Sequence, residues 1–438
     1  MGGEAQHGAR WLSGTGPMVR RASLPGLKEA ARRAPASLRN LRRPREAASG
    51  VGGAAAHPYQ RLQDGDALLY VVRAQDSAGH DAYRVTGWCG DLKVHTAAES
   101  PRLRAPGVGL GNARRDGEYP ADILHGIHLW SRNQRELGSW FNDIRARHGA
   151  ALRLLVWDDT GYELPWELFL LPADAARGFQ EAWLGAQVVT ARWTTVHDSG
   201  HDLPRGTTDC RGRVLGYLHH EMADDGRVFH PYAHQLHAKM TAFLQDLDTP
   251  GEPTGLVYMG CHGTYGDSVP RLTLGNRTWA ELDGQAMDTL RTDRSLVCLN
   301  ACHSGRAVLN RAQGEQALRG FAELFLRKGA GGCIVTVGQV GDEEARALVR
   351  GLVEQVAEYP HSPVTRTLLA FRARAAEEFG APSAVPPIRD DDGKVDKLGQ
   401  KRVLRLLYAF MFHYYGHPLT TLRLTAREPG KAEEGGTR

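Results

Sequence analysis

The chain has 438 residues, of which 42% are hydrophobic and 24% are charged, a balance typical of folded globular proteins. No stretch approaches the roughly 20 consecutive apolar residues that a membrane-spanning helix needs, which argues against an integral membrane protein. The formal net charge is +4, but residues 1–57 carry ten Lys and Arg against three acids, so the rest of the chain is slightly acidic. Such a body does not favour binding to nucleic acid.

Cysteine usage indicates a reducing compartment. The chain contains six cysteines, at Cys89, Cys210, Cys261, Cys298, Cys302 and Cys333. Six cysteines over this length are too few and too scattered for a disulfide framework. The N-terminal stretch never develops the apolar segment of a secretory signal, so we expect a cytoplasmic protein with reduced thiols.

Both ends of the chain are predicted to be disordered tails. Residues 1–57 are rich in Ala, Arg, Gly and Pro, and they cannot bury enough apolar surface to offset the entropy that ordering would cost. An arginine-rich arm that touches an acidic surface is the alternative interpretation of this segment. Residues 425–438 have a similar composition and are also predicted to be a tail.

Residues 58–149 predict a small mixed α/β module. Short strands are expected over Ala67–Arg73 and Ala82–Trp88, and a glycine-rich loop over Ala105–Gly117. A helix is expected over about Asn133–His148, because its apolar side chains recur at helical spacing. This pattern does not indicate what the module does.

From residue 150 to residue 424, buried strands alternate with amphipathic helices. The strands are expected over Leu152–Trp157, Arg213–His219, Leu256–Cys261, Ser295–Ala301 and Cys333–Val337. The helices are expected over Ala233–Leu247, Glu315–Lys328, Glu343–Tyr359 and Val364–Phe379, and a surface loop over Arg389–Arg402. This alternation predicts an α/β fold, with a mostly parallel sheet flanked by helices on both faces.

Reactive side chains follow two of the predicted strands. His262 comes directly after the strand 256–261, and Cys302 comes directly after the strand 295–301. The carboxyl ends of parallel strands meet at one edge of a sheet, so neighbouring strands would bring this imidazole and this thiol together. A free thiol is only slightly ionised near neutral pH, and a nearby imidazolium stabilises the thiolate. Gly263 lets the backbone approach a substrate closely, and its N–H and that of Cys302 are predicted to form an oxyanion hole.

These segments resemble the CHAT branch of the caspase-like cysteine peptidases. The resemblance rests on a His-Gly at 262–263 and on Ala-Cys-His-Ser-Gly at 301–305, each after an apolar strand. It extends to the Leu-Pro-Trp-Glu-Leu run at 164–168 and to the closing stretch at 408–418. It implies a cysteine endopeptidase over residues 150–424, with His262 as the base and acid and Cys302 as the nucleophile. It also implies a bacterial defence system, in which a sensor protein activates the peptidase and the substrate is an effector such as a gasdermin-like protein.

The substrate pocket differs from that of related peptidases. Asn300 occupies the position where metacaspase-like relatives carry an Asp that selects a basic residue before the cleaved bond. The loop after the strand 213–219 holds acids that could replace it, and the positions near Cys302 complete the predicted pocket. The predicted pocket residues are Asn300, Ser304, Glu221, Asp224, Asp225 and Gln339.

Two groups of residues carry metal-binding side chains, but neither is expected to form a metal site. One candidate set surrounds the dyad and comprises Cys261, His262, Cys298, Cys302 and His303. Successive strand residues face opposite sides of a sheet, so these side chains would not converge on one ion. The other set is His230, His234 and His237, which would share one face of a helix but lack a metalloprotease motif. No metal or cofactor is therefore predicted.

Two other functions remain open from the sequence. The chain could be a catalytically silent caspase-like scaffold that recruits partners through the same fold. It could also be a sensor or adaptor, in which residues 58–149 bind a signal and the Cys-His pair is incidental. The intact pair at His262 and Cys302 favours the peptidase over both.

Overall fold

The computed structural model describes residues 50–51, 62–76, 78–96, 119–196, 206–310 and 317–427. The predicted loop at 105–117 lies outside the described residues, as do the predicted tails apart from 50–51 and 425–427. Among the described residues, no helix combines the length and the apolar character needed to cross a membrane.

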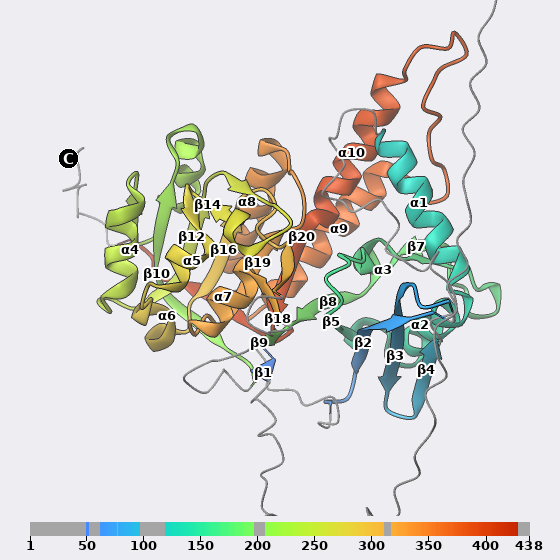
Figure 1. Ribbon diagram of the computed structural model, residues 1–438, viewed down its shortest axis with the longest axis horizontal. Coiled ribbons are helices and arrows are strands. Elements are labelled where there is room, and N and C mark those ends of the chain that lie inside the picture. The colour runs from blue at the N-terminus through green and yellow to red at the C-terminus, as the bar shows by residue number, and fades with distance from the viewer. Residues whose placement is uncertain are drawn as a thin grey trace, which may run out of the picture. The chain divides into compact units, whose positions relative to one another are not determined.

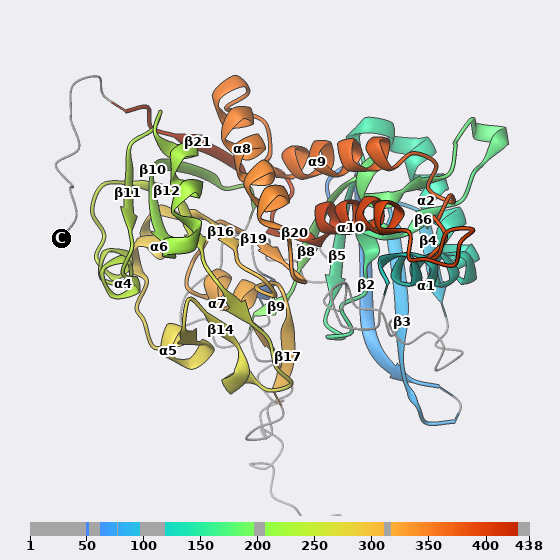
Figure 2. The same ribbon diagram turned by 90° about the horizontal axis from the view of Figure 1, so that it is seen from above.

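Twelve of the described strands form one sheet. The labels from β10 to β4 follow one another across Figure 1, and β11 and β21 are labelled in Figure 2. In spatial order they are β11 (His234–His237), β10 (Asp209–Leu218), β12 (Thr254–Gly260), β16 (Leu296–Asn300), β19 (Gly332–Thr336), β20 (Phe412–Gly416), β8 (Val189–Trp193), β5 (Arg153–Asp158), β2 (Asp66–Gln75), β3 (Asp81–Cys89) and β4 (Leu92–Thr96), with β21 (Thr421–Leu424) beside β10. Neighbours are antiparallel only at β19–β20, β2–β3 and β3–β4. All other neighbouring pairs of this sheet are parallel.

Helices cover both faces of the sheet. One group comprises α4 (Met240–Asp248), α5 (Trp279–Asp283), α6 (Asp288–Asp293) and α7 (Phe321–Arg327), and the other comprises α8 (Asp342–Glu358), α9 (Val364–Phe379) and α10 (Lys397–Met411). Figure 2 shows α5 and α7 on one side of β16 and β19, and α8 and α9 on the other. The structure therefore confirms the predicted α/β class, a mostly parallel sheet with helices on both faces.

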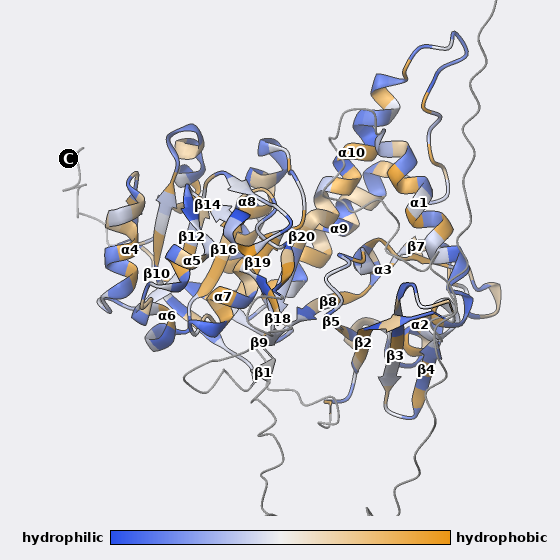
Figure 3. Ribbon diagram, viewed as in Figure 1, coloured by the Kyte–Doolittle hydropathy of each residue, from blue (hydrophilic) through white to orange (hydrophobic). Residues whose placement is uncertain are grey.

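The strands separate two hydrophobic cores because alternate side chains point to opposite faces. Val297 and Leu299 of β16 pack in the core with α4–α7, whereas Leu296 and Cys298 pack in the core with α8–α10. The strands β12, β16 and β19 are accordingly hydrophobic along their length, and the helices around them carry both colours in Figure 3. Burial on both faces explains why these strands lack an alternating polar pattern.

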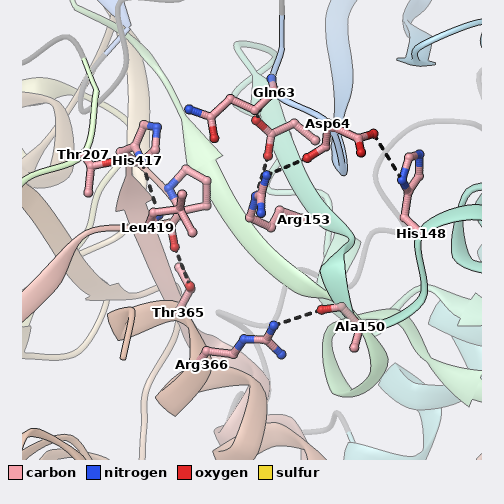
Figure 4. A network of polar contacts seen from close by, with 12 residues as sticks. Gln63, Asp64, His148, Ala150, Arg153, Thr207, Thr365, Arg366, His417 and Leu419 are labelled. Atoms are coloured by element: carbon pink, nitrogen blue, oxygen red, sulfur yellow. Dashed lines mark hydrogen bonds and ion pairs between the residues drawn. The ribbon is translucent and has the colours of Figure 1, made fainter. Parts of the chain in front are cut away.

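The predicted N-terminal module contributes strands to this same sheet. β2 pairs in parallel with β5, and α1 (Pro120–Asn133), α2 (Arg135–His148) and α3 (Leu184–Gln187) accompany them. Polar contacts tie this part to the rest at the edge where β5 begins (Figure 4). Arg153 donates to Asp66 at 2.6 Å, and Arg366 of α9 donates to the carbonyl of Ala150 at 2.9 Å. The sheet thus continues across the predicted boundary at residue 150, and the domain boundaries themselves stay predictions.

Short elements complete the described chain. The two- and three-stranded ribbons are β1 (Gly50–Val51) with β9 (Thr195–Val196), β6 (Leu170–Leu171) with β7 (Ala182–Trp183), β17 (Ala307–Asn310) with β18 (Ala317–Gly320), and β13 (Gly263–Thr264), β14 (Thr273–Leu274) and β15 (Arg277–Thr278). The 3₁₀ helices are η5 (Gly149–Ala151), η6 (Trp166–Leu168), η7 (Ala175–Arg177), η8 (His220–Phe229) and η9 (Val269–Arg271).

Three predictions about local structure are wrong. The segment 233–247 is not one helix, because its first residues form β11 at the edge beside β10 and α4 starts only at Met240. The segment 315–328 becomes helical only at Phe321, because β18 pairs with β17 first. The charged run 389–402 is not all loop, since Asp396 caps α10 through the backbone N–H of Gly399. In each case a tertiary pairing or a cap overrides the local pattern.

Candidate active site

His262 and Cys302 follow neighbouring parallel strands. β12 pairs with β16 so that Gly260 lies opposite Asn300, and His262 and Cys302 each come two residues later. The pairing continues past the strands, since the backbone N–H of Cys261 donates to the carbonyl of Asn300 at 3.3 Å. Both residues therefore leave the same edge of the sheet at matched positions, as a Cys-His dyad requires.

The backbone around His262 is held by a second ribbon. The carbonyl of His262 accepts a hydrogen bond from the N–H of Gly275 at 2.8 Å, and β13 starts at the next residue. Gly263 lies so close to the other segment that a Cβ there would come 2.1 Å from the carbonyl oxygen of Cys302. Only glycine fits this approach, which packs the backbone of Gly263 against the carbonyl of Cys302.

The turn that carries Cys302 is anchored to the end of β19. His303 has a φ of 60°, and its N–H donates to the carbonyl of Gly338 at 3.0 Å. The Ser304 side chain is buried, and its hydroxyl donates to the carbonyl of Leu299 at 3.3 Å and accepts from the N–H of Thr336 at 3.0 Å. Ser304, predicted to line the substrate pocket, thus holds the turn in place. A nucleophile on a braced turn needs little reorganisation before attack.

Cys302 differs from the other cysteines in its exposure. All six cysteines lie within the described residues, and five of them are buried while Cys302 is partly exposed. Burial raises the pKa of Cys261 and of Cys298 to about 12, and it raises the pKa of the other buried thiols as well. Thiols with a raised pKa are protonated near neutral pH and react slowly. Cys302 is therefore the one cysteine of the six that is partly exposed to solvent.

Glu221 contacts His262 instead of lining a pocket by itself. Its Oε2 lies 2.6 Å from His262 Nε2, and both side chains are more than half exposed, at 57% and 54%. The hydrogen bond from His262 lowers the pKa of Glu221, so the carboxylate is charged at neutral pH. A carboxylate at Nε2 places the ring proton there and leaves Nδ1 as the free nitrogen of the neutral imidazole. Glu221 was predicted as a pocket residue, and its contact with the imidazole was not foreseen.

Two other predicted pocket residues form a buried network with residues that the sequence did not single out. Asn300 donates to Asp225 at 3.1 Å and to the Tyr258 hydroxyl at 2.8 Å. Tyr258 donates to the same Asp225 oxygen at 2.8 Å, and Arg346 of α8 donates to the other oxygen at 3.2 Å. Asp225 and Arg346 line a cavity of about 370 Å³ between η8 and α8. The carboxylate beside Asn300 is therefore already paired with a cation.

The remaining predicted pocket residues lie at the surface. Asp224 pairs with Arg227 at 2.8 Å, and both are largely exposed. Gln339 is exposed in the segment between β19 and α8. Sequence reasoning missed His219, whose ring centroid lies 4.7 Å from that of His262. Its position directly after β10, at the same edge of the sheet, was the signal that could have identified it.

The residues considered as metal ligands from the sequence do not converge. Cys261 packs in the core with α4–α7, whereas Cys298 packs in the core with α8–α10, on the opposite face of the sheet. His230, His234 and His237 do not share a helix face, because His230 follows η8 and the other two lie in β11. Within the described residues, the histidines, cysteines and acids that gather closely enough to hold an ion are His219, Glu221 and His262.

A comparison with protein families matches the part of the chain that holds these residues. The family described as CHAT domain matches residues 221–374, which include both His262 and Cys302. No curated protein matches the chain significantly. Among solved structures, the chain is similar to the Arg-specific cysteine proteinase gingipain R, with 11% identity, coverage of 67% of this chain and 69% of that chain, and a TM-score of 0.42.

Two further solved structures are similar at comparable levels. The complex of the RgpB pro- and mature domains from Porphyromonas gingivalis shares 11% identity over 67% of this chain and 70% of that chain, with a TM-score of 0.37. The separase–securin complex from Saccharomyces cerevisiae shares 13% identity over 61% of this chain and 16% of that chain, with a TM-score of 0.33.

Proposed function

We propose that the chain is a cysteine endopeptidase with Cys302 as nucleophile and His262 as general base and acid. The observation that carries this proposal is the register of β12 and β16, which delivers an exposed imidazole and the one accessible thiol to the same edge of the sheet. The match of the CHAT domain to residues 221–374 supports the same assignment.

In the proposed reaction, His262 accepts the thiol proton at Nδ1, and the Cys302 sulfur attacks the carbonyl carbon of the scissile peptide bond. The imidazolium then returns the proton to the leaving amine, and the acyl group stays on sulfur as a thioester. A water molecule, deprotonated by the same imidazole, hydrolyses the thioester and restores the thiol. Glu221 holds the ring by its Nε2–H and stabilises the positive charge that the ring acquires.

The oxyanion of each tetrahedral intermediate would be bound by backbone amides. The predicted donors are the N–H groups of Gly263 and Cys302, and the close approach of Gly263 to the Cys302 carbonyl keeps these two residues adjacent. Donors of this kind contribute about 3–4 kcal/mol to the transition state, because they face a charge that is absent from the ground state. The floor of the substrate pocket would be formed by the network around Asn300 and Asp225.

The resemblance to CHAT peptidases of bacterial conflict systems supports a more specific role. In this role a sensor protein activates a cytoplasmic peptidase, which cleaves a companion effector, such as a gasdermin-like protein. Incubation with the products of neighbouring genes, followed by sequencing of any new N-terminus, tests the substrate. A new N-terminus that is produced by the wild type and not by Cys302→Ala identifies the cleaved protein.

The activity itself is tested with a thiol-reactive peptide electrophile and a peptide library. We expect wild type and Cys89→Ala, a control that removes a distant thiol, to be labelled once and to cleave peptides. Cys302→Ala and His262→Ala should lose both properties while their melting temperatures stay within a few degrees of wild type. A folded wild-type chain that is neither labelled nor active, with and without candidate activators, would support the silent scaffold instead.

A further inference from the structure

Three potential metal ligands gather beside the proposed base. His219, Glu221 and His262 each offer one ligand atom, and these atoms lie within 4.8 Å of one another. Two imidazoles and one carboxylate, with water in the fourth position, form the ligand set of several zinc proteins. We propose that this cluster is a zinc-binding site and that zinc bound there inhibits the peptidase. The binding of zinc stands by itself, whereas the inhibition rests on the proposed function.

The separations within the cluster suit a tetrahedral ion. Bonds of about 2.1 Å at tetrahedral angles place neighbouring ligand atoms about 3.4 Å apart. Glu221 Oε2 lies 2.6 Å from His262 Nε2 and 3.9 Å from His219 Nδ1, on either side of that value. His262 and Glu221 are more than half exposed, so small rotations of these side chains can open the shorter distance. The N–H of Glu221 donates to His219 Nδ1 over a long 3.5 Å contact, which coordination can replace at little cost.

The backbone already holds the three ligands near one another. The N–H of His219 donates to the carbonyl of Gly260 at 2.8 Å, which ties the end of β10 to the end of the strand that carries His262. The carbonyl of His219 accepts from the N–H of Met222 at 2.8 Å, which closes the first turn of η8 around Glu221. A site whose backbone is fixed before binding loses less conformational entropy when the ion arrives.

The cluster also lies where α/β sheets commonly bind ligands. From β10 the chain continues to β11 on one side and then to β12 on the other side. The crevice outside the carboxyl ends of β10 and β12 is therefore a topological switch point, which is the usual ligand site of an open α/β sheet. His219 and Glu221 follow β10, and His262 follows β12, so the cluster spans this crevice.

Zinc at this position would disable the base directly. A neutral imidazole has one protonated nitrogen and one free lone pair. If the ion takes the lone pair of His262 Nε2, the ring proton must reside on Nδ1, and no nitrogen remains to accept the proton of the thiol. Coordination also occupies the Glu221 carboxylate, which could then no longer stabilise an imidazolium. Zinc and catalysis therefore compete for the same two side chains.

Binding is tested in the full-length Cys302→Ala chain, which has no nucleophile and cannot bind zinc through that thiol. After treatment with a chelator and its removal, calorimetric titration with Zn²⁺ should give one ion per chain, and Co²⁺ should show the visible absorption of a tetrahedral site. Adding His219→Gln or Glu221→Gln should weaken binding by about tenfold or more, since each removes a ligand. Adding His230→Gln, a histidine outside the cluster, should leave the affinity unchanged. No binding, or equal affinity in all variants, overturns the site.

Inhibition is tested in chains that keep Cys302. Zinc should suppress peptide cleavage by the wild type, and a chelator should restore it. The rate of each variant is normalised to its own rate without zinc. The zinc concentration that halves this rate should then be about tenfold or more higher for His219→Gln than for the wild type. An unchanged value for His219→Gln would mean that zinc acts on the thiol, which overturns the proposed inhibition. Zinc binding by a chain without any peptidase activity would support the metal site and refute the proposed function.

Discussion

A buried ion pair joins the two parts of the sheet, and its removal tests how the fold is held together. Glu167 accepts two hydrogen bonds from Arg192 of β8, from Nε at 2.9 Å and from Nη2 at 2.5 Å. His413 of β20 lies 3.3 Å from one of the same carboxylate oxygens. Among the described residues, β20 pairs with β8 only at Tyr415 and Arg192. The ion pair thus connects strands that share little backbone hydrogen bonding.

The substitution Glu167→Gln removes the negative charge and keeps the shape of the side chain. It leaves Arg192 buried without a counterion, and Arg372, which is also fully buried, adds a second positive charge nearby. Two charges about 3 Å apart at an effective dielectric constant of about 20 attract by roughly 5 kcal/mol. Breaking a buried pair by removing one partner costs about 3–5 kcal/mol. We therefore expect the free energy of unfolding to fall by about 3–5 kcal/mol.

The pH dependence of this loss follows from the pKa of Glu167. Burial alone would raise this pKa, but Arg192 and His413 outweigh it and hold the pKa well below its usual range. A carboxyl with a depressed pKa in the folded chain stabilises fully above its unfolded pKa of about 4.3 and loses that contribution as the pH falls through the folded value. The difference in stability between wild type and Glu167→Gln should therefore be constant near neutral pH and shrink in acid.

Urea denaturation followed by tryptophan fluorescence measures the effect, since Trp166 and Trp193 adjoin the pair in the sequence. Glu343→Gln is the control, because Glu343 is 84% exposed and lies 3.9 Å from Arg405, so its loss should not shift the midpoint measurably. Combining Glu167→Gln with Arg192→Met should recover part of the stability, because no unpaired charge remains at that position. A loss below about 1 kcal/mol for Glu167→Gln, or no recovery in the double variant, would refute this reasoning.

Three further predictions concern the candidate active site. Iodoacetamide at neutral pH should modify one thiol per native chain, and peptide mass spectrometry should locate the modification at Cys302. Modification of a buried cysteine at a similar rate would contradict the assignment of the site to Cys302. Glu221→Gln should lower kcat about tenfold or more with little change in KM, because the imidazolium loses its counterion. The hydrogen bond from His262 lowers the pKa of Glu221, so Glu221 stays charged from neutral pH to below the usual Glu range. The ratio of wild-type to variant kcat should therefore be constant over that pH range. A ratio that already falls near neutral pH would count against this role. Arg346→Gln removes the cation that pairs with Asp225. It should raise kcat/KM about tenfold for substrates with a basic residue before the cleaved bond, relative to substrates with a neutral residue there. An unchanged preference would place the pocket elsewhere.

The strands were the part of the fold that the sequence predicted best. The five strands expected between residues 150 and 337 correspond to β5, β10, β12, β16 and β19. Their ends agree within about two residues except at the start of β10, which begins four residues earlier than predicted, at Asp209. These strands are buried on both faces, so their apolar runs are strong local signals. β11, β18 and the start of α10 were missed, because edge pairing and a side-chain cap decide them.

The joining of the N-terminal strands to the sheet was beyond the sequence. β2–β4 reach the main sheet through β5 and β8, and the seam between β8 and β20 depends on Glu167, Arg192 and His413. These residues come from distant parts of the chain and appear in the sequence as unrelated charges. The Pro-Trp-Glu run at 165–167 is one of the segments that carry the family resemblance, and in the structure its glutamate pairs with Arg192 in the core.

The sequence by itself determined which side chains follow the buried strands, and hence the choice of His262 and Cys302, because a strand and the residue after it are local features. It could not determine which side chains from other strands would stand beside them. Glu221 was expected to line a pocket and Asp225 to supply a free acid, yet one contacts the imidazole and the other is paired with Arg346 of α8. Such contacts depend on the order of strands in the sheet and on helices packed across it, and no local pattern of residues encodes either.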